Sequence, residues 1–594
     1  MSSRRRSRCA ISAPRSSSPG STRTCSSVRP SRSWHDVAAA HPPFPDPSGA
    51  VLVSAATSAV AQPGAFAPLR IRIFRWLWIV STISSIGSWM QTVGAQWFLV
   101  ENNASPAVIA LVQTAAAAPA LLLGIPAGVL GEFLNRRHLL IGVQAFQTLA
   151  GLALVVLSVA DLLNPVLLLT LTFLIGAAST VWLPAYQALI PELVPRPLIP
   201  NAAALSSIGV NVARAIGPAL AGLVIAQAGI PFVFAANLLT FALFLLVLIG
   251  WRGYTPAAPQ REPFVSATRA GLRYVLHAGV VRRMYLQLGL FMIPANALWA
   301  LLPVFASAHL GLDSSGYGIL LAALGIGSVS GAFLIPRLRS RWGTNATVMI
   351  STVVYGAGLA GAAFSTELVV TLPILLIVGA AWIGVIATLN GTVQAFLPAW
   401  VRSRGLSIYQ LVLFGGTALG AALTGALGTA FGTTQTLVGA GIVIIAVGGS
   451  LLIAPLLSTA DKDRRVLSLP LTDVPPVVTP SQPDDAASGP DDDDRSTLVM
   501  VRYEVPGEAR SAFLAVARDL ERSRRRTGAR SWQLYTEREN ASVLIEVFGV
   551  GSWREHLQQH DSRTTGYDQQ IIESARALAT GVPVTEHFLA AGRM

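Results

Sequence analysis

Side chains able to bind a solute occur inside long apolar segments of this chain. They are amides and aromatic rings, which suit a bulky amphipathic molecule better than a sugar or a small ion. A buried amide also needs a hydrogen-bond partner, so for any single residue we expect a structural role between two helices more often than a binding role. The candidates for a solute cavity are Gln91, Gln96, Trp97, Gln113, Trp182, Asn211, Asn237, Asn296, Trp299, Trp382, Asn390, Gln394 and Tyr409.

A second pattern places one charge among small residues in the segment 201–227. Small residues at every fourth position let two helices approach closely, and a proline bends the helix because it removes a backbone hydrogen bond. A charge inside a membrane helix costs about 2.5–3.5 kcal/mol, so Arg214 should face protein or water, or else extend toward the membrane surface. The motif consists of Gly209, Asn211, Ala213, Arg214, Gly217, Pro218 and Gly222.

A third pattern is the basic sequence GVLGEFLNRR, which is followed 203 residues later by GAFLIPRLRSR. Its carboxylate could pair with guanidinium or backbone N–H groups of a facing helix and hold one conformation closed, which is the behaviour of a gate. The alternative is a simple arginine anchor at the membrane surface. The predicted gating residues are Gly128, Glu132, Arg136, Arg137, Gly331 and Arg337.

The elements that must position these residues are twelve apolar stretches between Phe74 and Leu457. A bilayer core about 30 Å thick requires roughly 20 residues of helix. The sequence therefore predicts an all-α polytopic membrane protein, with twelve transmembrane helices in two halves of six. The predicted spans are 74–99, 106–130, 138–160, 165–190, 201–227, 230–250, 285–308, 315–336, 345–365, 368–396, 404–428 and 435–457.

The loops between these spans alternate between arginine-bearing and arginine-free. Arginine in short loops stays on the cytoplasmic side, so both termini are predicted to be cytoplasmic in a bacterial inner or plasma membrane. Only 12% of the residues are charged, against about 25% in soluble proteins. The formal charge of +13 then reflects cytoplasmic loops and the N-terminal tail rather than a nucleic-acid partner.

The membrane part repeats itself. Gly128 and Gly331 are 203 residues apart, as are Gly217 and Gly420 (331 − 128 and 420 − 217). We therefore predict an N-terminal half over 66–250 and a C-terminal half over 285–457, joined by a cytoplasmic loop over 251–284. Such halves leave a substrate path between them and open it alternately to each side.

GVLGEFLNRR resembles the signature loop of the major facilitator superfamily. Gly128, Arg136 and Arg137 match its glycine and basic pair, whereas Glu132 replaces an aspartate and Phe133 and Asn135 depart from the pattern. The segments SSIGSWMQTVGAQWFLV and IPELVPRPLIPNAAALSSIGVNVARAIGPALAG resemble bacterial efflux proteins related to enterobactin and siderophore exporters. This resemblance implies transport, and its Gly-Pro stretch implies an antiporter.

The energy source is constrained by what the spans lack. No Asp or Glu lies in the middle of a span, although proton-coupled carriers commonly use a buried carboxylate there. Coupling through Glu132 or Glu101 near the span ends is one route. No phosphate-binding loop of Walker type is present, so ATP is not expected to drive the protein, and no cofactor is predicted.

The ends of the chain differ from its middle. Residues 1–65 and the linker 458–496 are rich in Ser, Pro and charge, so we expect them to be disordered. Residues 497–594 predict a βαββαβ domain of ferredoxin-like type, with strands 498–505, 531–536, 542–549 and 584–588 and helices 509–527 and 553–578. Cys9 and Cys25 are the only cysteines, so the folded part has no disulfide framework.

This domain also resembles small dimeric domains of antibiotic-biosynthesis monooxygenase type, through its element order and the sequence SWREHLQQH. Trp553, His556 and His560 share one helical face. A packed core or a dimer face is the commoner reason for such a face than a ligand or catalytic pocket. A zinc site would require further ligands, of which His587 is the obvious one, and no metal is predicted.

Three functions remain open on the sequence. The leading one is a secondary transporter that exports small amphipathic molecules, such as drugs or siderophore-like metabolites, against proton influx. The second is a bifunctional protein whose C-terminal domain is a cofactor-free monooxygenase. The third is a transporter-like sensor with a regulatory C-terminal dimerisation domain. The partners expected for the leading function are a small-molecule substrate, protons and the lipid bilayer, but not nucleic acid.

Overall fold

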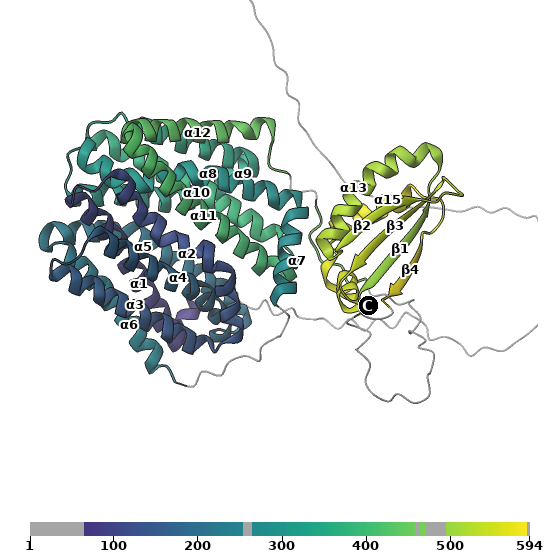
Figure 1. The fold of residues 1–594 in the computed structure, drawn as a ribbon, viewed down its shortest axis with the longest axis horizontal. Helices are drawn as coiled ribbons and strands as arrows, with labels where there is room; N and C mark the ends of the chain where they lie inside the picture. Colours follow the sequence, from purple (N-terminus) through teal and green to yellow (C-terminus); the bar gives the residue numbers. More distant parts are fainter. Residues whose placement is uncertain (1–63, 253–263, 458–461, 470–494, 591–594) are drawn as a thin grey trace, which may run out of the picture. The chain divides into compact units, whose positions relative to one another are not determined.

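The computed structural model describes residues 64–252, 264–457, 462–469 and 495–590, without the side chains of 125–133 and 264–268. The predicted tail 1–65 therefore lies almost wholly outside the described residues, as does most of the predicted linker. The described chain forms a bundle of long helices and a small α+β domain (Figure 1). The predicted class, a helical membrane protein with a small C-terminal α+β domain, is confirmed.

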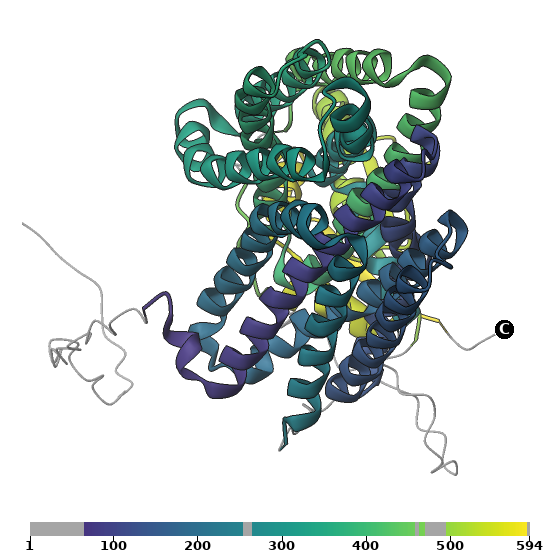
Figure 2. The same cartoon turned by 90° about the vertical axis from the view of Figure 1, so that its left-hand side faces the viewer.

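The bundle contains two sets of helices, which occupy different parts of it in Figure 2. The first helix set is α1 (Arg72–Glu101), α2 (Pro106–Phe133), α3 (Arg136–Val159), α4 (Pro165–Leu193), α5 (Ile199–Ala228) and α6 (Ile230–Gly250). The second helix set is α8 (Gly279–Val304), α9 (Ser314–Ala362), α10 (Leu368–Phe396), α11 (Ala399–Phe431) and α12 (Thr433–Ile453).

Local sequence explains where several of these helices begin. The side chains of Asn135, Asn164 and Asp313 accept hydrogen bonds from the first backbone N–H groups of α3, α4 and α9. Gly229 and Gly432 join the last two helices of each set with φ angles of 93° and 90°, which favour glycine. These two glycines are also 203 residues apart (432 − 229), in agreement with the predicted repeat.

Helix α9 contains two of the predicted spans. Gly343, with φ 77°, interrupts its helical backbone and joins the two parts without a loop. By length and composition, ten of the described helices could cross a membrane, with α9 counted once. Helix α1 is 30 residues long but does not reach that hydropathy, so the predicted count of twelve requires α1 and both parts of α9 to cross.

The two sets pack in the same pattern. In the first set α1 packs on α5 and α6, α2 on α4, and α3 on α4 and α6. In the second set α8 packs on α11 and α12, and α9 on α10 and α12, which are the equivalent pairs. The sets meet through α2 with α11 and through α5 with α9, two crossings that the repeat relates to each other.

The predicted central loop is partly helical. Residues Phe264–His277 form α7, and α8 begins at Gly279 rather than at 285. Ala270 and Tyr274 are buried one helical turn apart, whereas Arg269 and Leu272 are exposed, so α7 is an amphipathic helix. The predicted connecting loop thus contains a helix that the sequence analysis did not predict, and its cytoplasmic location stays a prediction.

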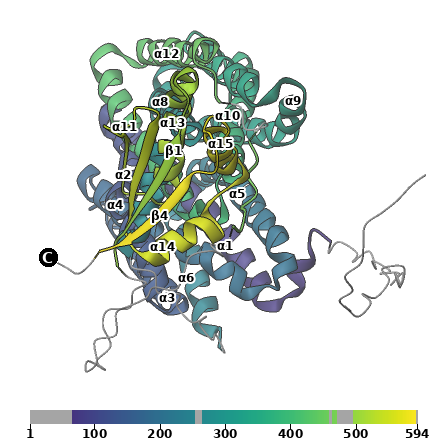
Figure 3. The same cartoon turned by 90° about the vertical axis from the view of Figure 1, so that its right-hand side faces the viewer.

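The C-terminal domain has the predicted element order and an antiparallel sheet of order β2-β3-β1-β4; β1 and β4 lie side by side in Figure 3. Its elements are β1 (Thr497–Glu504), α13 (Arg510–Thr527), β2 (Ser531–Thr536), β3 (Val543–Val550), α14 (Trp553–Gln558), α15 (Gly566–Ala577) and β4 (Val584–Leu589). Glu546 is buried beneath α13 and accepts hydrogen bonds from Tyr503 Oη (3.0 Å), Arg524 Nε (3.0 Å) and Trp532 Nε1 (2.8 Å). This carboxylate ties three strands to α13.

Two features of this domain differ from expectation. The predicted helix 553–578 is interrupted, because Thr565 and Asp568 form a capping box that begins α15. Residues 462–469 fall within the predicted linker, yet they run along 560–567: Leu467 N–H donates to the Thr564 carbonyl (2.9 Å) and Leu469 N–H to the His560 carbonyl (2.8 Å).

We expect Gly217→Leu to destabilise the bundle. A Cβ at Gly217 would lie 2.7 Å from Trp89 Cβ and 3.0 Å from the Ile86 carbonyl oxygen, so α5 would have to move away from α1. Overpacking of this kind costs roughly 1–3 kcal/mol. Thermal unfolding in detergent measures the effect, with Gly439→Leu as the control because no atom lies within 4 Å of a Cβ there. Equal melting temperatures for the two variants would contradict the close contact.

Candidate functional site

We call the interface between the two helix sets the seam. One part of it is the crossing of α2 with α11. The Ala107 N–H donates to Thr429 Oγ1 (2.9 Å), and Thr114 Oγ1 donates to the Ala418 carbonyl (3.1 Å). A Cβ on Gly425 would collide with Ala110. The two backbones are therefore close, and side-chain hydroxyls satisfy polar groups between them.

The equivalent crossing joins α5 to α9. A Cβ on Gly222 would lie 2.6 Å from the Ser314 carbonyl oxygen and 3.0 Å from Gly318 Cα. One on Gly325 would lie 2.6 Å from Ala215 Cα. Gly222, predicted as part of a small-residue motif, thus lies at a contact between the sets, whereas Gly217 contacts α1 within the first set.

Gln96 and Trp97 belong to the same seam. Gln96 Nε2 donates to the Trp299 carbonyl (3.1 Å), and Tyr317 Oη donates to Gln96 Oε1 (2.8 Å). Trp97 stacks on Tyr317 with ring centroids 5.7 Å apart. Both residues were proposed to line a solute cavity. In this structure they are buried and join α1 to α8 and α9, and Tyr317 and the Trp299 carbonyl supply the partners that a buried amide needs. A role of either residue in binding solute stays a prediction.

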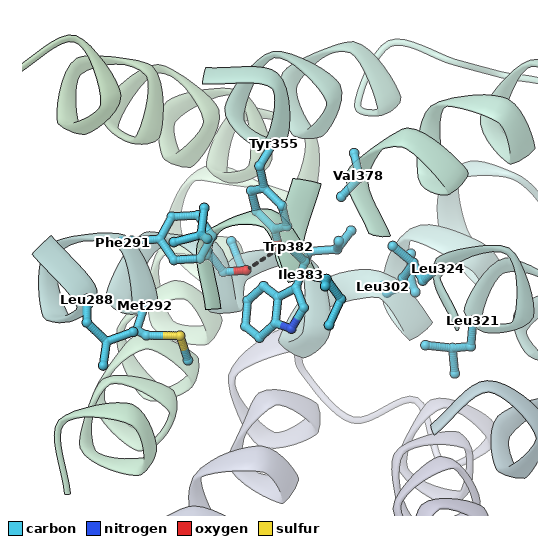
Figure 4. Packing of buried hydrophobic residues seen from close by; sticks show 14 of the residues in the cluster. Leu288, Phe291, Met292, Leu302, Leu321, Leu324, Tyr355, Val378, Trp382 and Ile383 are labelled. Carbon is cyan, nitrogen blue, oxygen red and sulfur yellow. Dashed lines mark hydrogen bonds between the residues drawn. The ribbon is translucent and has the colours of Figure 1, made fainter. Parts of the chain in front are cut away.

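An aromatic cluster adjoins these contacts, because Trp299 belongs to both. Trp382 on α10 has its ring centroid within 6 Å of those of Phe291, Trp299 and Tyr355. Figure 4 shows Phe291, Tyr355 and Trp382 gathered together among leucines. Trp89 of α1 extends the cluster to the first helix set, because its ring lies 5.9 Å from that of Trp299. Two predicted cavity residues, Trp299 and Trp382, are thus brought together.

Arg214 lies against this cluster. Its guanidinium carbon is 5.7 Å from the ring centroid of Trp89, a cation–π contact. Its neighbours in the motif have structural contacts: Pro218 is buried, and Asn211 Nδ2 donates to the Ser207 carbonyl of its own helix (2.9 Å).

Several of the other predicted cavity residues make contacts within the bundle. Gln91 accepts a hydrogen bond from Asn237, Asn390 accepts one from Gln394, and Asn296 donates to the Met292 carbonyl (2.6 Å). Tyr409 Oη donates to the Ile386 carbonyl (3.3 Å). Trp182 stacks on Tyr186 at 4.8 Å. A role of each in binding solute stays a prediction.

The predicted gating residues are only partly visible. The side chains of Gly128 and Glu132 lie outside the described residues. Arg136 forms an ion pair with Glu192 of α4, and Arg137 donates to the carbonyls of Leu248 (3.2 Å) and Ile249 (3.0 Å) at the end of α6. These contacts hold α3, α4 and α6 together within the first helix set. The sequence located Glu192 near the end of a span but did not predict its ion pair with Arg136, because the two residues are 56 positions apart.

The equivalent residues of the second helix set make simpler contacts. A Cβ on Gly331 would lie 2.8 Å from Ala380 Cα, so this glycine allows α9 to pack on α10. Arg337 is exposed and donates to the Phe333 carbonyl of its own helix (2.9 Å). The gating role of both residues remains a prediction.

The C-terminal domain brings three histidines together. The ring centroid of His556 lies 4.9 Å from that of His560 and 4.9 Å from that of His587, and Trp553 lies 5.4 Å from both His556 and His587. The sequence pattern found His556 and His560, and the pairing of β4 with β1 adds His587. Among the described residues, no group of three His, Cys, Asp or Glu could hold a metal ion.

Burial shifts the titration of this cluster. Loss of hydration lowers the pKa of His556 to about 3 and of His560 to about 4, and it also lowers the pKa of His587. The positive charge of Arg524 lowers the first two further. The three imidazoles are therefore neutral at neutral pH.

We expect acid to destabilise the C-terminal domain. The unfolded chain binds protons as the pH falls below 6.5, whereas folded His556 and His560 bind them only near their lowered pKa values. Stability is therefore complete above pH 6.5 and falls below it, by up to about 1.4 kcal/mol per pH unit for each neutral histidine. Denaturation of the full chain over a series of pH values tests this.

His556→Gln should flatten that dependence, because it removes one titrating group. His138→Gln, which alters a histidine of the bundle, should leave it unchanged. An equal free energy of unfolding of the C-terminal domain at about pH 7 and about pH 5 would contradict burial of the histidine cluster.

Comparison with known proteins places this chain in a family. The family MFS_3, described as transmembrane secretion effector, matches residues 63–594. The chain is 23% identical to the staphyloferrin A transporter of Staphylococcus aureus, over 49% of this chain and 74% of that one. It is 24% identical to the multidrug efflux pump Tap of Mycolicibacterium fortuitum, over 63% and 94%. It is 27% identical to the enterobactin exporter EntS of Salmonella choleraesuis, over 46% and 65%.

Solved structures agree on the fold. The nucleoside transporter NupG (D323A mutant) has a TM-score of 0.52 at 15% identity, over 64% of this chain and 99% of that one. A bacterial homolog of the human lysosomal transporter Spinster, in an inward-facing and unoccupied conformation, has a TM-score of 0.51 at 17% identity, over 65% and 96%. The family and the curated relatives are transporters and not enzymes, so the monooxygenase alternative has no support. The chain is a multi-pass membrane transporter and belongs to the MFS_3 family of transmembrane secretion effectors.

Proposed function

We propose that this protein exports small amphipathic molecules, drug-like or siderophore-like, by alternating access coupled to proton influx. The observation that carries the proposal is the pair of repeat-related crossings, α2 with α11 and α5 with α9. Two similar units that meet through symmetric crossings can exchange an opening on one side for an opening on the other. The staphyloferrin, enterobactin and multidrug transporters among the relatives support the class of substrate.

The seam contacts support the proposal of an inward-open state. Ala107, Gln96 and Gly222 lie in the parts of α2, α1 and α5 nearest the arginine-free loops. A seam closed there leaves the arginine-bearing end as the side that opens in this state. With arginine on the cytoplasmic side, that end faces the cytoplasm, from which an exporter loads its substrate.

Everted vesicles containing the full chain test export directly. We expect compounds from a panel of drugs and siderophore-like chelators to accumulate in the vesicles only while a proton gradient is present. A protonophore should abolish accumulation, and vesicles without the protein set the background. Accumulation that is insensitive to the protonophore would contradict proton coupling, and no accumulation of any compound would contradict export.

Glu132→Gln should lower transport in the same assay without lowering the abundance of the protein in the membrane. The reason is its position beside Arg136 and Arg137, where a carboxylate can bind a proton or hold the closed state. Glu367→Gln is the matched control, because Glu367 is exposed near an arginine-free loop. Unchanged transport by Glu132→Gln over a range of pH would exclude both roles of this residue.

The C-terminal domain is proposed to regulate the transporter rather than to take part in each cycle. One face of its sheet carries exposed apolar residues, among them Leu498, Tyr535 and Phe588, so a second copy of the domain is the proposed occupant. We expect removal of residues 459–594 to leave a transporter that inserts and exports but differs in oligomeric state, as measured by sedimentation in detergent. Loss of membrane insertion on truncation would contradict this.

A further inference from the structure

Arg214 lies at the middle of a membrane helix. It follows the first residue of α5, Ile199, by fifteen positions and precedes the last, Ala228, by fourteen (214 − 199 and 228 − 214). At 1.5 Å per residue both ends of the helix are about 21 Å away or more, which is beyond the reach of an arginine side chain. Arg214 therefore cannot extend its charge to the membrane surface.

The helix sets give this charge no anionic partner. In the part of the chain that the structure describes, Arg214 forms no ion pair, and its contact is the cation–π contact with Trp89. An aromatic ring interacts with the face of a guanidinium but does not satisfy its five N–H donors. Charged residues at this depth commonly mark the path of a substrate or an ion.

A second donor in the same cluster also lacks an acceptor. Trp299 Nε1 is buried and has no hydrogen-bond partner among the described residues. The centroid of the Trp299 ring lies 5.9 Å from that of Trp89, the ring with which Arg214 makes its cation–π contact. A buried donor without an acceptor is costly, so such groups in native structures require an explanation. Both groups are N–H donors, but the Arg214 side chain is half-buried whereas the Trp299 nitrogen is fully buried.

The acids of the bundle are too distant to serve both donors. Among the described residues of the two helix sets and their connecting loops, every carboxylate lies at or near a helix end: Glu101, Asp161, Glu192, Asp313 and Glu367. The cluster therefore presents positive charge, an N–H group and aromatic faces from both helix sets. A complementary ligand has an oxyanion next to an apolar or aromatic body.

We propose that Arg214, Trp89 and Trp299 bind the carboxylate end of the exported molecule, so that the substrates are anionic amphipaths. This inference rests on the proposed export function and narrows its substrate class. The guanidinium binds the carboxylate oxygens, the Trp299 indole donates to one of them, and the rings of Trp89, Trp299 and Trp382 contact the apolar body. Because α5 and α1 belong to the first helix set and α8 and α10 to the second, the bound molecule contacts both sets.

Three probes that share one biphenyl body test the charge preference: 4-biphenylacetate, 4-biphenylacetamide and 2-(4-biphenyl)ethylammonium. Equilibrium dialysis against the full chain in detergent measures each dissociation constant. We expect the carboxylate to bind at least about tenfold more tightly than the amide, and the ammonium to bind most weakly. Everted vesicles then measure transport of the same three compounds.

Variants separate a binding role from a structural one. Arg214→Gln should remove the preference for the carboxylate while the amide binds as before, and Arg214→Lys should retain part of the preference. Trp299→Phe keeps the apolar ring but loses the N–H, so it should weaken binding of the carboxylate and of the amide, whose oxygens both accept, but not of the ammonium. Arg72→Gln, which alters an exposed arginine at the start of α1, is the control and should bind all three probes as the unmodified chain does.

Two outcomes overturn the proposal. One is equal or tighter binding of the amide or ammonium by the unmodified chain, or failure to bind the carboxylate. The other is an Arg214→Gln variant that loses affinity for all three probes to the same extent, which would show a structural role. Either can occur while the vesicles export other compounds, so the charge preference can fail with export intact. Failure of the vesicles to export any compound is the separate failure of the proposed function.

Discussion

The close approach of backbones at the two seam crossings is the contact on which the rest of the bundle depends. Lipid is as apolar as the side chains that face it, so the hydrophobic effect does little to hold one membrane helix against another. Small residues at the crossings allow dispersion contacts and short polar contacts in its place. Gly222 against Gly318 and Ala110 against Gly425 therefore determine how near the two helix sets can come, and hence which buried rings can meet across the seam.

The apolar surroundings also determine how polar groups in the bundle are hydrogen-bonded. Many of the Ser and Thr hydroxyls inside the helices donate to a carbonyl one turn earlier, as Thr352 does to Val348 (2.7 Å), so they carry no unsatisfied donor into the apolar phase. Amides such as Gln96 are satisfied by carbonyl and hydroxyl groups of other helices. Several buried donors among the described residues of the bundle have no acceptor, and the Trp299 indole is one of them, whereas the half-buried Arg214 makes a cation–π contact and no ion pair.

Much of the fold could be predicted from the sequence, because apolar length and loop arginines are local properties. Span ends agree with the helices to within a few residues, except that α8 and α11 begin earlier and the first part of α9 ends later than predicted. The amphipathic α7 was missed because a search for apolar length passes over short helices. The break at Thr565 was missed although its capping box is a local signal. Partners distant in sequence, such as Glu192 for Arg136 or Tyr317 for Gln96, depend on how the helices cross and could not be predicted from either residue alone.

The two helix sets repeat each other in packing but not in how they turn at their arginine-bearing ends. The first set connects α2 to α3 through Leu134 and Asn135, whereas the second connects the two parts of α9 through Gly343. A joint of one residue has two rotatable backbone angles, so the direction of the second part depends on a single φ and ψ pair that residues with a Cβ rarely adopt. The φ angle at Gly343 disfavours any residue with a Cβ, whereas the first turn has Leu134 and Asn135 and needs the Asn135 side chain to cap α3. The two sets therefore pack alike, but their turns depend on different properties, a backbone conformation in one and a side-chain hydrogen bond in the other.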